Sequence, residues 1–334
     1  MTKLLEIDQL SIEFASSSGT VRVVNGVRLE LEAGETLGIV GESGSGKSVT
    51  SLSIMRLLPK GLAKVAEGDI RLHGRSLLDM SEAEMQKVRG NQIATIFQEP
   101  MTALNPVFKI GRQVRESIRQ HSKKSKREAH KEAIALLGEV GISAPEQIME
   151  AYPHQLSGGM RQRVMIAMAM ASNPDILIAD EPTTALDVTI QAQILELMKK
   201  LQKERGTAII FITHDLGVVA EMCDRVAVMY AGQIVEQGDV RTLFKEPKHP
   251  YTIGLLNSMP QFSGEKKRLE AISGQVPHPS EYLPGCRFAK RCPSRMDVCE
   301  SIEPSLYDFG NQHRCKCHLY RGGYGCCPFL RSRI

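Results

Sequence analysis

The stretch Gly41-Glu42-Ser43-Gly44-Ser45-Gly46-Lys47-Ser48 fits the phosphate-binding pattern G-x-x-x-x-G-K-[ST] at every fixed position. The apolar residues 36–40 before it predict a short strand, and residues 49–58 after it predict a helix. This strand–loop–helix order is the context that the pattern needs. A Gly/Ser-rich linker is the alternative, but a linker has no reason to keep Lys47 and Ser48 in these places or a strand in front.

The residue types of this stretch suit a nucleotide triphosphate. Glycines let the backbone turn several N–H groups toward one point, and the helix N-terminus adds about half a positive charge there. Lys47 brings a mobile charge to the outer phosphates, and Ser48 offers a hydroxyl to Mg²⁺. Phe14, the nearest preceding aromatic, is either a purine-stacking or a core residue. The predicted ATP-binding residues are Gly41, Glu42, Ser43, Gly44, Ser45, Gly46, Lys47, Ser48, Val49 and Phe14.

Length and composition indicate a globular protein. The chain has 334 residues, 42% of them apolar and 24% charged, with a net charge of +4, which allows one large domain with an appendage or two domains. The N-terminus lacks a signal-peptide core, and no uncharged apolar run reaches the roughly 18–20 residues that span a bilayer. We therefore expect a cytosolic chain unless a partner holds it at a membrane. The basic excess after residue 285 is only weak evidence for nucleic acid, and no interleaved aromatics strengthen it.

Three further segments predict strands of a nucleotide-binding core. Residues 4–14 and 21–31 alternate as two antiparallel strands. Residues 93–98 form an apolar strand that ends on Gln98. A glutamine at the carboxyl end of a strand, where phosphate loops gather, can reach a metal ion or a water. A merely solvated strand end is the alternative.

The sequence from about 100 to 172 changes to a helical pattern. Within it Ala133, Leu136 and Val140 have the spacing of one buried helix face, which predicts a helical subdomain inserted between strands of the core. The subdomain ends with Leu156-Ser157-Gly158-Gly159 and a helix. Ser-Gly-Gly at a helix N-terminus can bind an anion, or it can be an ordinary turn.

Carboxylates and a histidine follow two other predicted strands. Asp180 and Glu181 close an apolar strand, and His214 ends a second one. Because neighbouring residues of a strand point in opposite directions, the two carboxylates should have different roles. A solvated polar strand end is the alternative.

These signals occur in one order: the phosphate-binding stretch, Gln98, Leu156–Gly159, Asp180–Glu181, Asp187 and His214. In this combination residues 3–280 resemble the nucleotide-binding subunit of an ABC transporter. The resemblance implies an α/β P-loop ATPase core with an antiparallel β subdomain, an inserted helical subdomain and a small Cys-rich, metal-binding C-terminal extension. The implied division is 1–98 and 173–245 for the ATP-binding core, 99–172 for the helical signature subdomain, and 246–334 for the extension.

The same resemblance implies a head-to-tail dimer with two ATP molecules at its interface. Leu156, Ser157, Gly158 and Gly159 of one subunit would face the ATP on the phosphate loop of the other. Asp187 would link the two sites. Each subunit would then supply only half of the donors around the triphosphate.

Roles within one site are also implied by the resemblance. Lys47 would hold the β and γ phosphates. Ser48 and Gln98 would coordinate Mg²⁺, with Asp180 behind them through a water. The catalytic residues would be Glu181, His214 and Gln98: Glu181 polarises the attacking water, and His214 contacts the γ-phosphate and steadies that water.

A narrower resemblance concerns the transported solute. His249-Pro250-Tyr251-Thr252, with residues 152–155 and 187–193, looks like the oligopeptide/dipeptide importer ATPases. It implies an ATPase that powers peptide uptake from the cytoplasmic face of the membrane, as a peripheral subunit. The implied partners are two permease subunits, an extracytoplasmic solute-binding protein and a second ATP-binding subunit, a homologue in the cell or an identical copy in isolation; no nucleic acid is implied. Nickel and other small-solute importers share these features.

Two other functions compete with the importer. Soluble ABC ATPases of DNA repair or translation usually fuse two cassettes or carry coiled-coil or zinc insertions, whereas this chain has one cassette and no coiled coil. An iron–sulfur regulatory protein with residual ATPase activity is the third reading.

Seven of the eight cysteines follow residue 285, which suggests metal rather than disulfides in a cytosolic chain. No pair has the C-x₂-C spacing of a zinc ribbon. The importer branch has a similar set, which implies a [4Fe–4S] cluster on Cys286, Cys292, Cys299 and Cys317. Cys315 is the alternative fourth ligand, and zinc or free thiols are the alternative states. A structural and a redox role both stay open, and Cys326-Cys327 has no assigned role.

Overall fold

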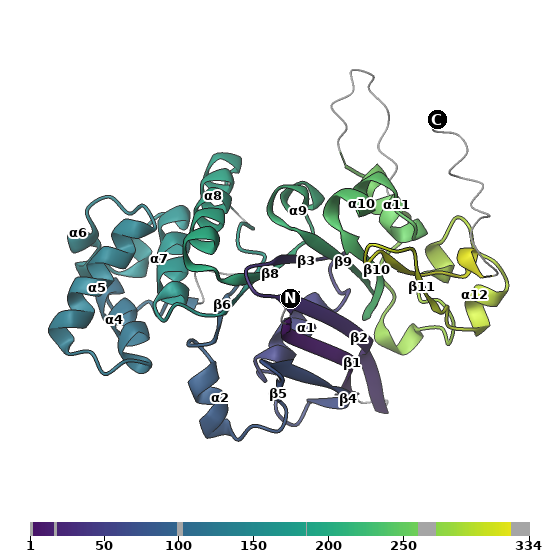
Figure 1. Cartoon of the computed structure of the whole chain (residues 1–334), viewed down its shortest axis with the longest axis horizontal. Coiled ribbons are helices and arrows are strands. Elements are labelled where there is room, and N and C mark those ends of the chain that lie inside the picture. The colour runs from purple at the N-terminus through teal and green to yellow at the C-terminus, as the bar shows by residue number, and fades with distance from the viewer. Residues whose placement is uncertain (1–2, 17–18, 99–102, 185, 260–271, 322–334) are drawn as a thin grey trace, which may run out of the picture.

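A computed structural model describes residues 3–16, 19–98, 103–184, 186–259 and 272–321 (Figure 1). Its larger sheet has eight strands in the order β11-β12-β10-β9-β3-β8-β7-β6. The parallel part consists of β9 (Arg225–Tyr230), β3 (Thr36–Val40), β8 (Ala208–Thr213), β7 (Ile176–Asp180) and β6 (Ile93–Ile96). Strands β3 and β8 are buried at every position, as expected for a parallel sheet covered on both faces.

Alternate residues of the parallel strands feed two different cores. Leu177 and Phe211 pack with the helices that follow β6, whereas Ile178 and Ile210 pack with a second, antiparallel sheet. This alternation follows from the two-residue period of a strand. Helix α8 (Val188–Arg205) contributes to the first of these cores.

The second sheet has the order β2-β1-β4-β5. Its strands are β1 (Lys3–Ser16), β2 (Gly19–Glu32), β4 (Ala63–Leu72) and β5 (Arg75–Ser76). The two strands predicted at 4–14 and 21–31 lie within β1 and β2 and pair antiparallel, so this prediction is confirmed. Helix α2 (Glu82–Val88) follows, and Ser81 begins it with a capping box.

Helix α1 (Lys47–Ile54) follows the phosphate-binding stretch. The prediction of a helix over 49–58 is correct in type, but its end is wrong. The helix stops at Ile54, and Arg56 then adopts a left-handed φ of 50°, a conformation that no α-helix can continue.

The chain between β6 and β7 is helical, as predicted, and its helices gather on one side of the molecule (Figure 1). They are α4 (Ile110–Gln120), α5 (Lys126–Glu139), α6 (Pro145–Glu150), the 3₁₀ turn η1 (Pro153–Gln155) and α7 (Gly158–Met170). Ala133, Leu136 and Val140 are buried, which confirms the predicted helix face.

The C-terminal part of the chain adds to the core sheet instead of packing alone. Helix α9 (Leu216–Met222) lies between β8 and β9. The elements after β10 (Gln233–Asp239) are α10 (Val240–Lys245), α11 (Pro250–Asn257), η2 (Pro279–Glu281), η3 (Ala289–Arg291), α12 (Val298–Ser301), β11 (Leu306–Asp308), β12 (Arg314–Lys316) and η4 (His318–Tyr320). Strand β12 pairs antiparallel with β10, and β11 pairs with β12. Tyr230 of β9 also contacts Tyr251 and Phe288 edge-on, with ring centroids 4.7 and 5.1 Å away. The extension therefore shares its apolar core with the cassette. Among the described residues, no helix combines the length and apolarity of a bilayer span.

Candidate active site

The phosphate loop, residues 41–48, runs against the strand pair β9–β10, and its glycines make this possible. A Cβ on Gly41 would lie 2.1 Å from the backbone oxygen of Met229, which no side chain tolerates. Gly46 has a φ of 104° and lies directly before α1, a conformation that glycine adopts at little cost. The loop can therefore follow this path only with glycine at these two positions.

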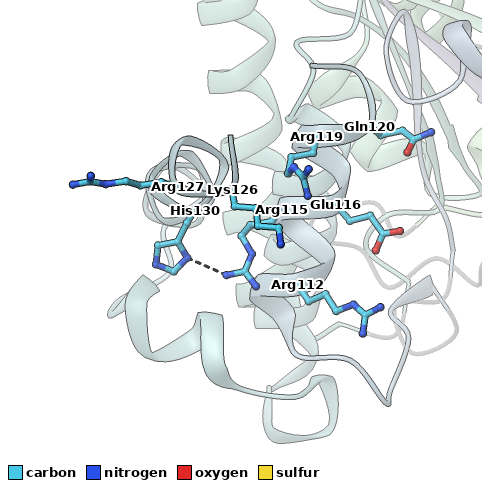
Figure 2. A pocket seen from close by; sticks show the side chains of 8 residues that line it. All are labelled: Arg112, Arg115, Glu116, Arg119, Gln120, Lys126, Arg127 and His130. Atoms are coloured by element: carbon cyan, nitrogen blue, oxygen red, sulfur yellow. Dashed lines mark hydrogen bonds between the residues drawn. The ribbon is translucent and has the colours of Figure 1, made fainter. Parts of the chain in front are cut away.

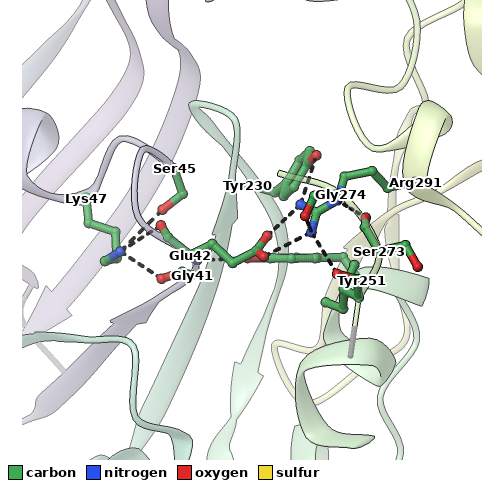
Figure 3. Close-up of polar contacts among 10 residues, drawn as sticks. Gly41, Glu42, Ser45, Lys47, Tyr230, Tyr251, Ser273, Gly274 and Arg291 are labelled. Atoms are coloured by element: carbon green, nitrogen blue, oxygen red, sulfur yellow. Dashed lines mark hydrogen bonds and ion pairs between the residues drawn. The ribbon is translucent and has the colours of Figure 1, made fainter. Parts of the chain in front are cut away.

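Lys47 is folded back onto the loop. Its Nζ donates hydrogen bonds to the carbonyl oxygens of Gly41 at 2.7 Å and Glu42 at 3.0 Å (Figure 3). Burial lowers the pKa of Lys47, and the negative charges of Glu181, Asp180 and Glu42 act against this shift. The lysine thus lies within electrostatic reach of both carboxylates at the end of β7.

Glu181 is the centre of a polar cluster drawn from three parts of the chain. Its Oε2 accepts hydrogen bonds from Gln98 Nε2 at 3.0 Å and Thr184 Oγ1 at 2.9 Å, and its Oε1 lies 3.2 Å from Nδ1 of His214. Glu181 also has a left-handed φ of 48°, which a glutamate adopts only at a cost and which is common at functional sites. The structure brings the three predicted catalytic residues together.

Asp180, the residue before Glu181, has a different environment. Burial raises the pKa of its carboxyl group, and a hydrogen bond from Ser48 acts against this shift. Its Oδ1 is buried and has no hydrogen-bond partner among the described residues. An orphaned carboxylate oxygen beside a hydroxyl provides the oxygen donors that Mg²⁺ prefers, so Ser48 and Asp180 fit the ion.

These groups border a cavity of about 1040 Å³. Its polar lining includes Glu42, Gln98, Glu181 and His214, and the segment 272–279 of the C-terminal extension forms another part of its wall. Phe14 is not among the residues that line this cavity. It is half-buried in β1 and packs against the core between the antiparallel sheet and the larger sheet. The sequence motifs predicted the polar lining of the cavity. They did not predict the hydrogen bond from Thr184 to Glu181 or the wall formed by residues 272–279, because neither segment belongs to a motif.

The signature residues lie away from this cavity. Leu156 is buried, whereas Ser157 and Gly158 are exposed at the start of α7, where the Ser157 hydroxyl accepts a hydrogen bond from the Met160 N–H at 3.3 Å. None of the four predicted signature residues lines the cavity of the same chain. Asp187 begins α8 and accepts a hydrogen bond from the Ile190 N–H at 2.9 Å. Next to it, Val188 is 83% exposed.

A second cavity, of about 960 Å³, lies between α4 and α5 (Figure 2). Five cationic side chains line it: Arg112, Arg115, Arg119, Lys126 and Arg127. The other lining residues are Glu116, Gln120 and His130. Arg115 contacts His130 at 3.0 Å, and none of the five cations has a carboxylate ion-pair partner in the described part of the chain. This basic groove is separate from the nucleotide cavity, with which it shares no lining residue.

The cysteines of the extension do not form a finished metal site. Within the described residues, no group of three or more His, Cys, Asp or Glu side chains is arranged to hold a metal ion, so the predicted [4Fe–4S] cluster is not confirmed. Burial raises the pKa of Cys317 to about 12, and Cys286, Cys292 and Cys299 add to this shift. Cys315 is fully buried on β12 and pairs with Glu236 of β10. Cys326 and Cys327 lie outside the described residues.

A phosphate loop at the end of β3, facing strand-end carboxylates on β7, defines a P-loop nucleotide-binding protein. The model of the ABC transporter family matches residues 24–184, and that of the oligopeptide/dipeptide transporter C-terminal region matches residues 235–299. The chain belongs to the family of ABC transporter ATP-binding proteins, in the branch of the oligopeptide and dipeptide transporters. The family and the transport-coupled ATPase that the sequence predicted are thereby confirmed.

Relatives in this branch match nearly the whole chain. The oligopeptide transport ATP-binding protein AppD of Bacillus subtilis is 53% identical over 96% of this chain and 98% of its own length. The dipeptide transport ATP-binding protein DppD of the same organism is 51% identical over 96% and 95%. Among solved structures, the dimeric bacterial ABC transporter cassette MJ0796 is 30% identical and covers 71% of this chain and 99% of its own, with a TM-score of 0.64. The ABC cassette fold, with its mixed α/β sheets, is confirmed.

Proposed function

We propose that this chain is the ATP-hydrolysing subunit of an importer that takes up di- or oligopeptides through a separate membrane permease. The relatives named for oligopeptide and dipeptide transport, which match over nearly the full length, support the solute class. The main support for ATP hydrolysis is the position of Glu181. Gln98 and His214 orient its carboxylate at the cavity that the phosphate loop borders. Nickel or another small solute is the alternative cargo.

The phosphates of ATP would bind at the N-terminus of α1. The loop N–H groups and the helix end supply fixed positive potential for them. Lys47 would exchange its hydrogen bonds to the Gly41 and Glu42 carbonyls for bonds to the β and γ phosphates. A desolvated ammonium is a stronger partner for phosphate than a hydrated one, so burial of Lys47 favours this exchange. Val49 would complete the loop's contacts, and Phe14 would serve the core rather than the purine.

Glu181 would act as the general base toward the attacking water. Its carboxylate is held at both oxygens, which fixes its direction before the water arrives. His214 would steady the water and contact the γ-phosphate. Mg²⁺, held by Ser48, Gln98 and Asp180, would supply charge neutralisation of the triphosphate. Phosphoryl transfer depends mainly on such positioning and electrostatics.

Each site would be completed by a second subunit. Ser157 and Gly158 are exposed and Gly159 is half-buried at the start of a 13-residue helix, whose N-terminal N–H groups suit the γ-phosphate of a facing ATP. Leu156 would anchor this turn by its burial, and Asp187 would link the two sites beside the exposed Val188. In the cell we expect a homologous partner subunit, and in isolation an identical copy.

The chain would be a peripheral protein at the cytoplasmic face of the membrane, with an extracytoplasmic binding protein delivering the solute to the permease. We expect the permease to dock on the helical subdomain and on the region after Gln98. Phe97 and Val107 are 44% and 69% exposed, and exposed apolar side chains suit a docking surface. We also propose the division into core 1–98 and 173–245, helical subdomain 99–172 and extension 246–334. The gathering of the helices between β6 and β7 on one side of the molecule supports it (Figure 1).

Reconstitution with the permease tests this function. The chain, its partner ATPase and the two permease subunits are placed in liposomes with the binding protein, and ATP turnover is measured with di- and oligopeptides and with nickel. Peptide-stimulated turnover supports the proposal, stimulation by nickel alone moves the cargo to the alternative, and salt-sensitive DNA binding without permease binding would favour the repair-type ATPase.

We further propose that Cys286, Cys292, Cys299 and Cys317 hold a [4Fe–4S] cluster, with zinc as the alternative. Beyond burial, Cys286, Cys292 and Cys299 all raise the pKa of Cys317, which supports this set; the pKa of Cys315 is raised first by burial and then by Glu236. Buried thiols with raised pKa values become ligands when a metal displaces their protons. Iron and sulfide in a brown, anaerobically purified protein would support the cluster, and colourless protein with one zinc per chain would exclude it.

A further inference from the structure

We infer that Arg291 of the C-terminal extension is a positioning residue of the nucleotide site and that it acts through Glu42 of the phosphate loop. This inference rests on the proposed function, because it assigns a role in ATP binding. It makes the extension a working part of the ATP site rather than an appendage to it.

The two side chains form a two-pronged ion pair across the molecule (Figure 3). Nη1 of Arg291 lies 2.6 Å from Oε2 of Glu42, and Nη2 lies 3.0 Å from Oε1. The Arg291 side chain is only 6% exposed and that of Glu42 is 31% exposed, so the protein covers most of the pair and reduces its screening by solvent. Paired N–H···O bonds of this kind fix direction as well as distance.

Glu42 is held a second time, through its backbone. Its N–H donates a 2.9 Å hydrogen bond to the hydroxyl of Tyr251 in α11, and Tyr251 is fully buried. The ring of Tyr251 packs against Tyr230 and Phe288. Main chain and side chain of one phosphate-loop residue are thus both fixed by groups of the C-terminal half of the chain.

Arg291 is itself anchored to the wall of the cavity. Its Nε donates to the carbonyl oxygen of Ser273 at 2.8 Å, and Nη2 donates to that of Gly274 at 3.1 Å. Gly274 and Glu42 both line the nucleotide cavity. Arg291 therefore ties one wall of this cavity to the loop that would bind the phosphates.

Two consequences for ATP follow from this geometry. The carbonyl oxygen of Glu42 accepts a hydrogen bond from Lys47, so the orientation of Glu42 sets the resting place of the phosphate-binding cation. A carboxylate in a phosphate loop also repels a polyphosphate, and Arg291 neutralises it at close range. Without Arg291, Glu42 would be a free negative charge beside the triphosphate.

The test measures MgATP affinity of the full chain by equilibrium binding, together with KM and kcat. Arg291→Gln is expected to raise Kd and KM about 10- to 100-fold, as loss of an outer partner of a site typically does, with little change in kcat. Arg291→Lys keeps the positive charge but cannot form both hydrogen bonds to Glu42, so its Kd and KM should lie between those of Arg291→Gln and the parent. Glu42→Gln combined with Arg291→Gln should recover most of the lost affinity, because no unpaired carboxylate remains.

The matched control is Arg295→Gln. Arg295 belongs to the same extension and forms an exposed ion pair with Glu300, so its loss should leave Kd unchanged. Parental ATP affinity in Arg291→Gln overturns the inference. If Arg291→Gln unfolds, the double variant decides: recovered affinity supports the inference, and weak binding in a folded double variant overturns it. Peptide-stimulated turnover of the parent tests the proposed function separately. A failure of that function can therefore be distinguished from a failure of the inference about Arg291.

Discussion

The side-chain amide of Gln98 donates a 3.0 Å hydrogen bond to the carboxylate of Glu181, which lies 83 residues further along the chain. The bond exists because β6 and β7 are parallel neighbours whose carboxyl ends meet at one sheet edge. The inserted helices therefore begin next to the proposed general base, and the insertion ends at the opposite edge of the sheet, where Ile176 starts β7. Any shift of the segment after Gln98 would reach Glu181 through this contact.

Replacing Glu181 with glutamine should separate ATP binding from hydrolysis. An amide cannot accept the proton of the attacking water, so turnover should fall roughly 10²- to 10⁴-fold, the usual contribution of a general base. ATP binding should persist because Lys47 and the phosphate loop are unchanged. Phosphate release and equilibrium nucleotide binding measure the two effects. Glu204→Gln, at an exposed position of α8, is the control, and near-normal turnover of Glu181→Gln would remove Glu181 from this role.

The same variant should reveal the second subunit. With MgATP and no hydrolysis, Glu181→Gln is expected to elute as a dimer in size-exclusion chromatography, since ATP would bridge two half-sites. Adding Ser157→Arg should restore the monomer without weakening nucleotide binding, because Ser157 does not line the cavity of its own chain. Ser301→Arg, an exposed serine in α12, serves as the control. A Ser157→Arg chain that still dimerises with ATP would contradict the proposed interface.

Local sequence patterns predicted the parts of the site that are carried by strand ends and by the phosphate loop. Gln98, Glu181 and His214 could be placed together because each ends an apolar strand, and such ends meet in a parallel sheet. The Arg291–Glu42 pair could not be found this way, since its partners are 249 residues apart and neither belongs to a pattern that names the other. Strands β11 and β12 escaped prediction for a related reason. Each has three residues, too few to show a period, and their pairing to β10 is a tertiary effect.

Gly41 and Gly44 provide a paired test of the phosphate-loop path. An alanine at Gly41 would place its Cβ 2.1 Å from a backbone oxygen of β9, which cannot rotate away. We expect the free energy of unfolding to fall by about 1–3 kcal/mol, as for overpacking. A Cβ added at Gly44 would meet no atom of the described residues within 4 Å, and only the φ of 79° disfavours alanine there, at about 1–2 kcal/mol. Urea denaturation without nucleotide measures both, and a smaller loss for Gly41→Ala than for Gly44→Ala would contradict the close approach.

His249 should make the stability of the chain depend on pH. The residue is buried at the start of α11, where its backbone N–H donates to the buried carboxylate of Glu236, and burial lowers the pKa of its imidazole to about 4. In the unfolded chain its pKa is near the ordinary value of about 6.5. The unfolded state therefore binds the extra proton first, so stability is complete above pH 6.5 and is lost as the pH falls toward 4. At about pH 5 the loss from this group should be about 2 kcal/mol.

His249→Asn isolates this effect. Asparagine keeps a side-chain acceptor for the Tyr251 N–H, which His249 Nδ1 now accepts at 3.0 Å, but it does not titrate. The free energy of unfolding, measured in urea between about pH 7.5 and pH 5, should decline less steeply in this variant than in the parent. His278→Asn, at an exposed histidine with the same capping role, should leave the parental slope unchanged. An identical slope in His249→Asn and the parent would mean that His249 does not control the loss of stability in acid.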